Sequence, residues 1–390
     1  MNQLLERGVE EIIEKEHLRA RLDRGDKLRI KLGIDPTAQD LHLGHTVVLR
    51  KLRQFQDAGH QAVFIIGDFT ATIGDPSGRN ESRPALSEKD IKDNMKNYLN
   101  EAGKVIDLKK AEIHHNSEWY KKKDTGFLME LASKFTVARM MERDDFQKRL
   151  KDGQDISLLE ILYPILQGYD SFAVKADLEL GGTDQKFNLL TGRKVQKRYG
   201  QAEQDVMTMV LIEGLDGSKK MSKSLGNYIG LSERPEDMFG KTMSLPDVLM
   251  PKYFSVLTDV PDEEIDRLKK DLNSQNSSGQ SLKGWKERLA YELVKIYHGE
   301  REAKKVRDEF NRVFSKREIP EDVKEWKTGG DSGIVDILVD SDSVKSKTEA
   351  KRLIDQKALS INGHTITDWD FKVKKGQVVK IGPRKFLKVL

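Results

Sequence analysis

Apolar residues recur along the chain in two spacings, and the order of these patterns predicts the architecture of its first half. Residues 28–34 read as a strand, and the apolar run at 62–68 is long enough for a buried parallel strand. Residues 112–116 can form another strand. The stretches between them, 44–57 and 87–108, carry apolar residues at helical spacing with charged residues in between. This alternation of strand, helix and strand predicts an α/β fold with a doubly wound parallel sheet of the Rossmann type.

The rest of the chain predicts further elements and domains. Residues 1–26 have the pattern of an amphipathic helix, and residues 177–180 and 206–212 read as two more strands. Adjacent glycines at 329–330 indicate a linker. The predicted domains, in chain order, are the sheet domain at 1–230 with a mostly helical insertion at about 125–174, a helical domain at 231–314, a linker at 315–333, and a small α+β domain at 334–390.

Candidate nucleotide chemistry lies where the first predicted strand meets its helix. Residues 35–37 form an Asp-Pro-Thr turn, and His42 and His45 fall at the start of the helix that follows. Unpaired backbone N–H groups and the helix dipole favour phosphate there, and imidazoles add donors for charge on a leaving pyrophosphate. Gly44 lets a ribose or base approach the backbone. Taken alone, this motif has an alternative interpretation, in which the two histidines only form hydrogen bonds at the start of the helix and bind no ligand.

A second motif, Lys-Met-Ser-Lys-Ser at residues 220–224, follows a Gly-containing stretch at 214–218. Lysines on a mobile loop can close over a triphosphate and stabilise charge that develops only in the transition state. Such a loop on its own is most often solvated surface. Its occurrence after the histidine motif, at domain-scale separation, makes the pair a strong signal of nucleotide chemistry.

Tyr163, Gln167 and Asp170 form a third candidate set. They are spaced four and three residues apart, so a helix would place them on one face. A polar face can simply be solvated. Because the neighbouring residues are mostly Ile, Leu and Phe, a substrate pocket is the favoured interpretation.

Composition and charge narrow the class of protein. The chain is 37% hydrophobic and 34% charged, and it has no apolar run long enough to span a membrane. The absence of cysteine excludes disulfides and thiolate zinc sites and is compatible with a reducing cytosol. The basic surplus lies at the C-terminus, because residues 334–390 hold 12 Lys and Arg against 7 Asp and Glu. Such a surplus attracts a polyanion, for which RNA is the natural candidate.

The motifs resemble those of a known family. His42-Leu43-Gly44-His45 and Lys220-Met221-Ser222-Lys223-Ser224 resemble the two signatures of class I aminoacyl-tRNA synthetases. Further segments are similar to those of bacterial tyrosyl-tRNA synthetases: Asp35-Pro36-Thr37, Gly74-Asp75-Pro76-Ser77-Gly78, Tyr163 with Gln167 and Asp170, and Gly181-Gly182-Thr183-Asp184-Gln185. The basic C-terminal segment resembles the S4 RNA-binding module at residues 345–354 and 359–363. The resemblance covers nearly the whole chain.

This resemblance implies an activity and a role for each matched residue. L-tyrosine and ATP would give tyrosyl-adenylate and pyrophosphate, and the tyrosyl group would then pass to the 3′ end of tRNA(Tyr). The resemblance also implies a homodimer formed through the insertion, a cytoplasmic location, Mg²⁺ accompanying ATP, and no tightly bound cofactor or resident metal. The implied site residues are His42, His45, Lys220, Lys223 and Thr37 for catalysis; Asp35, Gly44, Gly182, Asp184, Met221, Ser222 and Ser224 for ATP; Lys31, Gly33, Asp75, Tyr163, Gln167, Asp170 and Gln185 for tyrosine; and Lys345, Lys347, Lys351, Arg352, Arg384 and Lys385 for tRNA.

The chain departs from the family pattern at Lys31 and in the lysine loop, where Met221 and Ser222 stand in place of the Phe-Gly of some relatives. Three other functions also stay open. Many bacterial relatives have a tyrosine where this chain has Lys31. The lysine could donate to the phenolic oxygen, or it could turn outward and leave Asp170 as the main discriminator. The other functions are a tryptophanyl-tRNA synthetase, an unrelated adenylyltransferase with a similar histidine motif, and an RNA-binding protein without catalysis. The S4-like tail and the third candidate set argue against the tryptophanyl enzyme.

Overall fold

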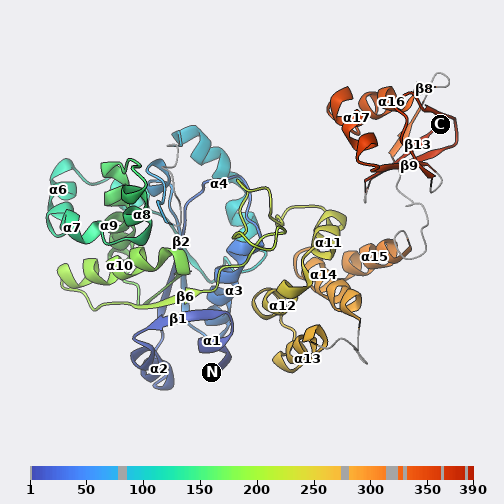
Figure 1. Ribbon diagram of the computed structural model, residues 1–390. Helices are drawn as coiled ribbons and strands as arrows, with labels where there is room; N and C mark the ends of the chain where they lie inside the picture. Colours follow the sequence, from blue (N-terminus) through green and yellow to red (C-terminus); the bar gives the residue numbers. More distant parts are fainter. Residues whose placement is uncertain are drawn as a thin grey trace. The chain divides into compact units, whose positions relative to one another are not determined.

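The computed structural model of the 390-residue chain describes residues 2–77, 86–273, 281–312, 324–327, 332–361, 364–382 and 385–390. The chain divides into two compact units, residues 1–298 and 299–390, and each is described by itself. Figure 1 shows the first unit as a central sheet with helices around it, followed along the chain by a further group of helices.

A six-stranded sheet forms the centre of the first unit, in the order β1-β6-β5-β2-β3-β4. Its strands are β1 (Val9–Ile13), β2 (Arg29–Ile34), β3 (Gln61–Ile66), β4 (Glu112–His115), β5 (Leu178–Gly182) and β6 (Asp205–Met209). The strands from β6 to β4 are parallel, and β1 pairs antiparallel with β6 at one edge. The predicted doubly wound parallel sheet is therefore confirmed, with an antiparallel edge strand added.

The N-terminal segment differs from the prediction of one amphipathic helix over residues 1–26, which is wrong. The segment contains two short helices, α1 (Asn2–Glu6) and α2 (Lys15–Asp23), with β1 between them. Glu14 has a φ of 64°, so the chain turns before α2 instead of continuing a helix. Because β1 gains a ladder of backbone hydrogen bonds with β6, tertiary pairing outweighs the local helical pattern.

The helices that follow β2, β3 and β5 cover the sheet. α3 (Leu43–Asp57) packs an apolar stripe on β2, β3 and β5, and α10 (Lys186–Arg198) packs on β5 and β6. α4 (Glu88–Ala102) begins with a capping box, in which Asp90 N–H donates to Ser87 Oγ and Ser87 N–H donates to Asp90 Oδ2, both at 3.2 Å. The first residues of these helices mark where the loops that leave the carboxyl ends of β2, β3 and β5 end.

Five helices occupy the segment between β4 and β5. They are α5 (Ser117–Tyr120), α6 (Thr125–Ser133), α7 (Val137–Met140), α8 (Asp144–Lys151) and α9 (Leu158–Ala173). α9 lies against α10, and Gly168 and Gly192 meet at the contact. A Cβ on Gly168 would lie only 3.1 Å from the Gly192 Cα, so the two glycines permit this close approach.

The first unit ends in helices α11 (Pro235–Met243), α12 (Met250–Leu257), α13 (Asp262–Asn273) and α14 (Leu282–His298). Short 3₁₀ turns, η1 (Thr70–Thr72), η2 (Thr183–Gln185) and η3 (Asp247–Leu249), lie in the connecting loops. Arg7 ties the N-terminal segment to this group, because its guanidinium donates to the carbonyls of Ser255 and Val260 at 2.7 Å each. None of the helices in the described ranges is long and apolar enough to cross a membrane.

The second unit contains α15 (Glu300–Phe310) and a small α+β fold. Its sheet has the order β10-β9-β12-β13-β7, and β8 pairs with β11 separately. Its other elements are β7 (Lys324–Trp326), β8 (Ser332–Gly333), α16 (Ile334–Asp340), α17 (Lys347–Asp355), β9 (Leu359–Ile361), β10 (His364–Thr365), β11 (Lys372–Val373), β12 (Val378–Ile381) and β13 (Lys385–Val389). β7 lies in the stretch predicted as a linker, yet its parallel pairing with β13 makes it part of the sheet. Apolar residues of α16, α17 and the sheet form one core.

Candidate functional site

The histidine motif forms the start of α3. His42 is the N-cap residue, and its Nδ1 accepts a hydrogen bond from the Gly44 N–H at 3.1 Å. His45 Nδ1 accepts from the His42 N–H at 3.1 Å, which completes a capping box. The ring centroids are 3.9 Å apart. Because both Nδ1 atoms accept, each neutral ring carries its proton on Nε2, where it can be donated to a ligand.

Burial keeps both imidazoles neutral. Desolvation is the main cause that lowers the pKa of His42 to about 2 and the pKa of His45 to about 4. The ammonium of Lys223 also contributes to the lowered pKa of both rings. Near pH 7 the two histidines are therefore hydrogen-bond donors, and the positive charge of the site comes from lysines.

Backbone hydrogen bonds join the histidine motif to the segment that follows the lysine loop. Leu43 N–H donates to the Ile229 carbonyl, and Leu231 N–H donates to the Leu41 carbonyl, both at 3.0 Å. The carboxylate of Glu101, which is 1% exposed, accepts from the Leu41 N–H. The two motifs, far apart in the sequence, are thus fastened side by side.

The lysine loop, residues 213–227, is shaped by its own polar side chains. Asp216 Oδ1 accepts from the N–H groups of Lys219 at 2.8 Å and Ser218 at 2.9 Å. These backbone hydrogen bonds are the main cause that lowers the pKa of Asp216 to about 2. The buried side chain of Asn227 accepts from the Ser222 N–H at 2.8 Å. The loop therefore has a defined conformation around its lysines.

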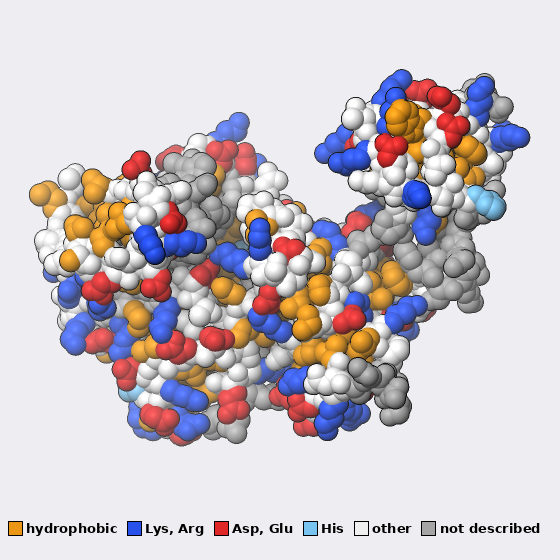
Figure 2. Space-filling view, in the orientation of Figure 1, with side chains coloured by type: hydrophobic (Ala, Val, Ile, Leu, Met, Phe, Trp, Pro, Cys, Tyr) orange, Lys and Arg blue, Asp and Glu red, His pale blue; other side chains and the backbone are white. Residues whose placement is uncertain are grey.

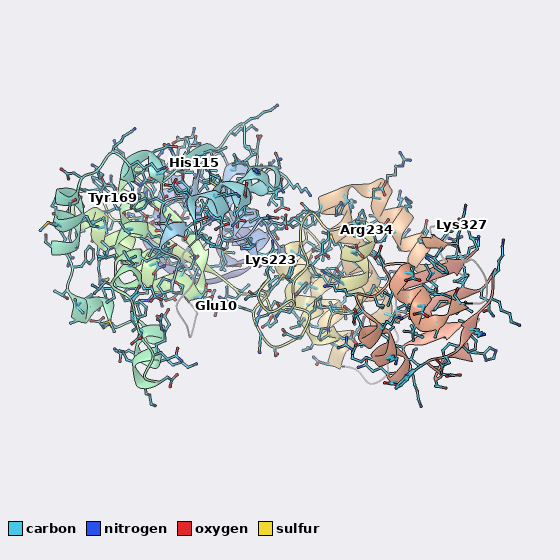
Figure 3. The ribbon with its side chains drawn as sticks, turned by 90° about the horizontal axis from the view of Figure 1, so that it is seen from above. Glu10, His115, Tyr169, Lys223, Arg234 and Lys327 are labelled. Atoms are coloured by element: carbon cyan, nitrogen blue, oxygen red, sulfur yellow. The ribbon has the colours of Figure 1, made fainter. Side chains whose placement is uncertain are left out.

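Met221 is buried in this loop, and the lysines on either side of it pair with acidic residues. Lys220 Nζ lies 2.8 Å from Asp184 Oδ2, and Lys223 Nζ lies 3.3 Å from Asp40 Oδ2. Figure 3 shows Lys223 where the sheet layer meets the yellow helices of the first unit. Asp184 is one of the residues predicted to bind ATP, whereas Asp40 was not singled out from the sequence.

A chain of hydrogen bonds crosses the carboxyl ends of β2, β3 and β4 and ends on α9. Tyr163 OH donates to Asp35 Oδ2 at 2.8 Å, and Thr70 Oγ1 donates to Asp35 Oδ1 at 2.7 Å. Asn116 Nδ2 donates to Thr70 Oγ1 at 2.9 Å and to Asp170 Oδ2 at 3.2 Å. Two members of the predicted tyrosine set, Tyr163 and Asp170, are therefore connected through residues of other segments.

Asp170 is a buried carboxylate among aromatic side chains. Trp119 Nε1 donates to its Oδ1 at 3.0 Å. Its neighbour Tyr169 is labelled among the green helices in Figure 3. Desolvation raises the pKa of Asp170 to about 6, while the Lys31 ammonium and hydrogen bonds from Asn116 and Trp119 oppose that rise. A carboxylate with remaining acceptor capacity suits a phenolic hydroxyl group.

The other predicted tyrosine residues share a second network. Gln167 Oε1 accepts from Asn188 Nδ2 at 2.9 Å, and the same amide group donates to Asp75 Oδ1 at 3.2 Å. Gln185 Nε2 lies 3.4 Å from Asp75 Oδ2. Arg143, at the start of α8, donates to Asn188 Oδ1 at 2.5 Å. The structure thus brings Asp75, Gln167 and Gln185 together around Asn188, which the sequence analysis missed.

Lys31 lies below this network and not at the surface. Its side chain is 1% exposed. Its Nζ donates to the Gln167 carbonyl at 3.0 Å, to Ser171 Oγ at 2.8 Å and to Glu179 Oε1 at 2.7 Å. The outward orientation considered for Lys31 is therefore wrong. Direct contact with a phenol would require one of these three bonds to break, because an ammonium group has only three donors.

The remaining predicted site residues lie at the same edge of the sheet. Thr37, predicted for catalysis, and Ser222 and Ser224, predicted for ATP, lie in loops. Gly33 lies in β2, Gly182 ends β5, and Gly44 lies in the first turn of α3. A Cβ on Gly33 would meet no other atom within 4 Å, so open space lies beside β2 at this point. A Cβ on Gly182 would lie 2.6 Å from Asp184 Oδ1, so a larger residue there would displace that carboxylate.

The predicted tRNA-binding residues belong to the second unit. Lys345, Lys347, Lys351 and Arg352 are exposed in α17 or just before it. Lys351 Nζ lies 4.7 Å above the Trp369 ring, and Lys347 Nζ lies 2.8 Å from Asp336 Oδ1. Arg384 lies outside the described residues, and Lys385 is described only in its backbone.

Family models match nearly the whole chain. The model described as tRNA synthetases class I (W and Y) matches residues 23–315, and the Tyrosine–tRNA ligase SYY-like C-terminal domain matches residues 315–381. The tyrosine–tRNA ligase of Thermotoga maritima is 49% identical over 388 residues, which cover 99% of this chain and 96% of the relative. That of Carboxydothermus hydrogenoformans is 47% identical over 401 residues, covering 100% and 97%.

Solved structures share the fold at lower identity. A truncated mitochondrial tyrosyl-tRNA synthetase of Aspergillus nidulans matches 80% of this chain and 93% of its own, with a TM-score of 0.67 and 22% identity. Tyrosyl-tRNA synthetase of Archaeoglobus fulgidus, solved with L-tyrosine, matches 78% and 98%, with a TM-score of 0.62 and 23% identity. The solved structures show the shared fold, and the sequence matches over nearly the whole chain show the family. The chain belongs to the tyrosine–tRNA ligase family of class I aminoacyl-tRNA synthetases.

Proposed function

We propose that the residues described above activate L-tyrosine with ATP and transfer the tyrosyl group to tRNA(Tyr). The observation that carries this proposal is the arrangement of the start of α3, the lysine loop and the polar face of α9 along the carboxyl ends of β2, β3 and β5. In open parallel sheets ligands bind at that edge. We also propose a cytoplasmic location, which the family resemblance supports.

In the first step the tyrosine carboxylate attacks the α-phosphorus of ATP, and the bond to the bridging oxygen of pyrophosphate breaks. The Nε2–H groups of His42 and His45 would donate to the phosphates, joined by Thr37. Lys220 and Lys223 would stabilise charge on the departing pyrophosphate, because the segment that follows their loop is hydrogen-bonded to the histidine motif. No covalent enzyme intermediate is required.

The nucleoside would occupy the space beside the glycines. Gly44 and Gly182 would let the ribose approach the backbone, and Asp184 would accept from its hydroxyl groups. Because Lys220 pairs with Asp184 in this structure, ATP binding would exchange that carboxylate for a phosphate. Mg²⁺ would arrive with the phosphates of ATP, a common mode of magnesium binding.

Tyrosine would lie between the two hydrogen-bond networks. Asp75, Tyr163 and Gln167 would hold its α-ammonium group, and Gln185 would lie near its carboxylate. Asp170 would accept the phenolic hydrogen. Phenylalanine would leave the buried carboxylate without this donor, at a cost in binding free energy. Tyrosyl-tRNA synthetases are a known example of enzymes that reject phenylalanine because it lacks the hydroxyl group.

The first prediction concerns the phosphate groups. Replacing His45 or Lys223 with Ala should slow tyrosyl-adenylate formation by about 100- to 1000-fold, the usual effect of losing one transition-state donor. Tyrosine affinity should change little, because neither residue belongs to the tyrosine networks. Single-turnover pyrophosphate release and equilibrium dialysis with tyrosine measure the two effects. Lys219→Ala, on the same loop, is the matched control, and an equal loss of rate and tyrosine affinity in His45→Ala would contradict the assignment.

The second prediction concerns Asp170. Asp170→Ala should narrow the ratio of kcat/KM for tyrosine over phenylalanine by about 10- to 100-fold, because a charge-assisted hydrogen bond is lost. Asp177→Asn is the control, since Asp177 accepts from Arg21 and the Arg29 N–H at the amino end of β5. An Asp170→Ala variant that keeps its full preference for tyrosine would refute the assignment.

The pH dependence follows from the same carboxyl group. Its pKa is raised from the ordinary value of 3.8 to about 6, so kcat/KM for tyrosine should fall as the pH drops through about 6. The raised pKa also means that the folded state binds this proton more tightly than the unfolded state does. At this group the free energy of unfolding therefore increases as the pH falls from about 6 towards 4. Asp170→Asn should abolish both effects, which pH profiles of exchange and of urea unfolding can measure.

We propose that the exposed basic face of α17 binds the phosphates of tRNA(Tyr), and a third prediction follows. Combined replacement of Lys347, Lys351 and Arg352 with Ala should weaken tRNA binding and reduce the salt dependence of tRNA charging. Each lost phosphate contact should reduce the slope of the logarithm of the binding constant against the logarithm of the salt concentration by about 1. Tyrosine-dependent pyrophosphate exchange should be unchanged. A triple Ala variant of the exposed residues Arg267, Lys269 and Lys270 on α13 is the control. Unaltered charging by the α17 variant would contradict the proposal.

We also propose that the segment from α6 to α9 forms a homodimer interface. Apolar side chains gather over this segment in Figure 2. The exposed ones include Leu128, Met129, Val137, Leu150, Leu158 and Leu159, with exposures from 39% to 78%. An apolar patch of this kind is typical of a surface that another subunit covers.

The fourth prediction is that Met129→Asp combined with Leu159→Asp converts the dimer to a monomer, because each subunit would then bury two charged carboxylates in an apolar interface. Val248→Asp is the control, since Val248 is 73% exposed but lies outside the segment. Sedimentation velocity measures the outcome. A wild-type monomer, or a double variant that remains dimeric, would rule out this interface.

A further inference from the structure

Lys31 and Glu179 form a buried ion pair directly beneath the proposed tyrosine site. They are register partners on the adjacent parallel strands β2 and β5. Both side chains are 1% exposed, and Lys31 Nζ lies 2.7 Å from Glu179 Oε1. Replacing a buried ion pair by apolar residues of similar volume often leaves stability unchanged or raises it. Fold stability alone therefore does not account for the pair.

The pair is attached to one particular turn of α9. Lys31 Nζ donates to the Gln167 carbonyl and to Ser171 Oγ, at 3.0 and 2.8 Å. Glu179 accepts from Gln167 Nε2 at 3.3 Å and from Ser171 Oγ at 3.0 Å. Asp170 lies on this turn, between the two attached residues. The ion pair thus fixes the part of α9 that presents Gln167 and Asp170.

The surroundings are built to leave room for these contacts. A Cβ on Gly192 of α10 would lie 3.1 Å from both Glu179 Oε2 and Ser171 Oγ, so any larger residue would press on the pair. Gln204 Nε2 donates to the same Glu179 oxygen. Lys31 is, in addition, the cation that most favours the ionised form of Asp170 and so opposes the rise in its pKa.

We propose that Lys31 and Glu179 are positioning residues for tyrosine selection, which act by fixing the α9 turn that carries Gln167 and Asp170. This inference rests on the proposed function. Lys31 does not touch the substrate in this account. It acts through the helix, which explains how a lysine can occupy a position where direct contact with the phenol was one expectation.

The test compares two ion pairs that both fasten α9. Lys31→Met combined with Glu179→Gln removes the pair beneath the site and leaves no unpaired charge. Arg149→Met combined with Glu160→Gln removes a second buried pair, whose Arg149 Nη1 to Glu160 Oε1 distance is 2.7 Å, from the first turn of the helix. Pyrophosphate exchange gives KM for tyrosine, KM for ATP and kcat, and the same assay with phenylalanine gives the selectivity.

The Lys31/Glu179 variant should raise KM for tyrosine by about 10-fold and narrow the tyrosine-to-phenylalanine ratio of kcat/KM by a similar factor, the usual effect of losing one or two well-placed hydrogen bonds. Its kcat and KM for ATP should change by less than about 2-fold, because the phosphate groups lie on other elements. The Arg149/Glu160 variant should keep the tyrosine-to-phenylalanine ratio of kcat/KM of the unmodified protein, whether or not its stability falls.

Ser171→Ala is a smaller change for the case that the double variant does not fold. It removes one partner of each charged group and should narrow the selectivity by about 2- to 5-fold. Unchanged selectivity in every folded variant of the pair, or equal narrowing in the Arg149/Glu160 variant, would overturn the inference while leaving the proposed function intact. Absence of tyrosine-dependent exchange in the unmodified protein would overturn both.

Discussion

Two backbone hydrogen bonds between residues 41–43 and 229–231 determine how the phosphate chemistry of this protein is assembled. They hold the end of the lysine loop against the start of α3, whose histidines are fixed by their own capping interactions. The buried Glu101 carboxylate reinforces the junction, since it accepts from the Leu41 N–H and from the Ser232 hydroxyl. The loop can therefore exchange the partners of its lysines while its anchored end keeps it beside the histidines.

The amino-acid side of the site depends on a different constraint, the burial of charge. Asp170, Lys31 and Glu179 are each less than 5% exposed, and all three lie on or beside one turn of α9. Buried charges cost free energy unless they are paired and hydrogen bonded. The two fully paired charges support the helix, whereas Asp170 keeps acceptor capacity with a pKa near 6. The least satisfied charge is the one proposed to meet the substrate.

Much of this arrangement could be predicted from local sequence patterns. Apolar runs gave the parallel strands, and the four-and-three spacing placed Tyr163, Gln167 and Asp170 on one helix. Other features depend on pairing between distant segments. β1 forms only because β6 offers it an edge, and β7 because of β13. Local patterns do not record such partners.

The polar partners inside the site show the same limit. Trp119, Asn116 and Asn188 reach the site from the helices and loops beside the predicted residues, and no motif marked them. A signal for the Lys31–Glu179 pair did exist, because each is a charged residue with an apolar residue on either side of it in its strand. Only the register of β2 and β5 shows that the two charges meet.

The most direct measurement is ATP–pyrophosphate exchange by the full-length protein with tyrosine, tryptophan and phenylalanine supplied separately. We expect exchange with tyrosine, with kcat/KM for the other two amino acids lower by about 1000-fold or more, because neither can give Asp170 a phenolic donor. Comparable exchange with tryptophan, or no exchange with any of the three, would contradict this expectation.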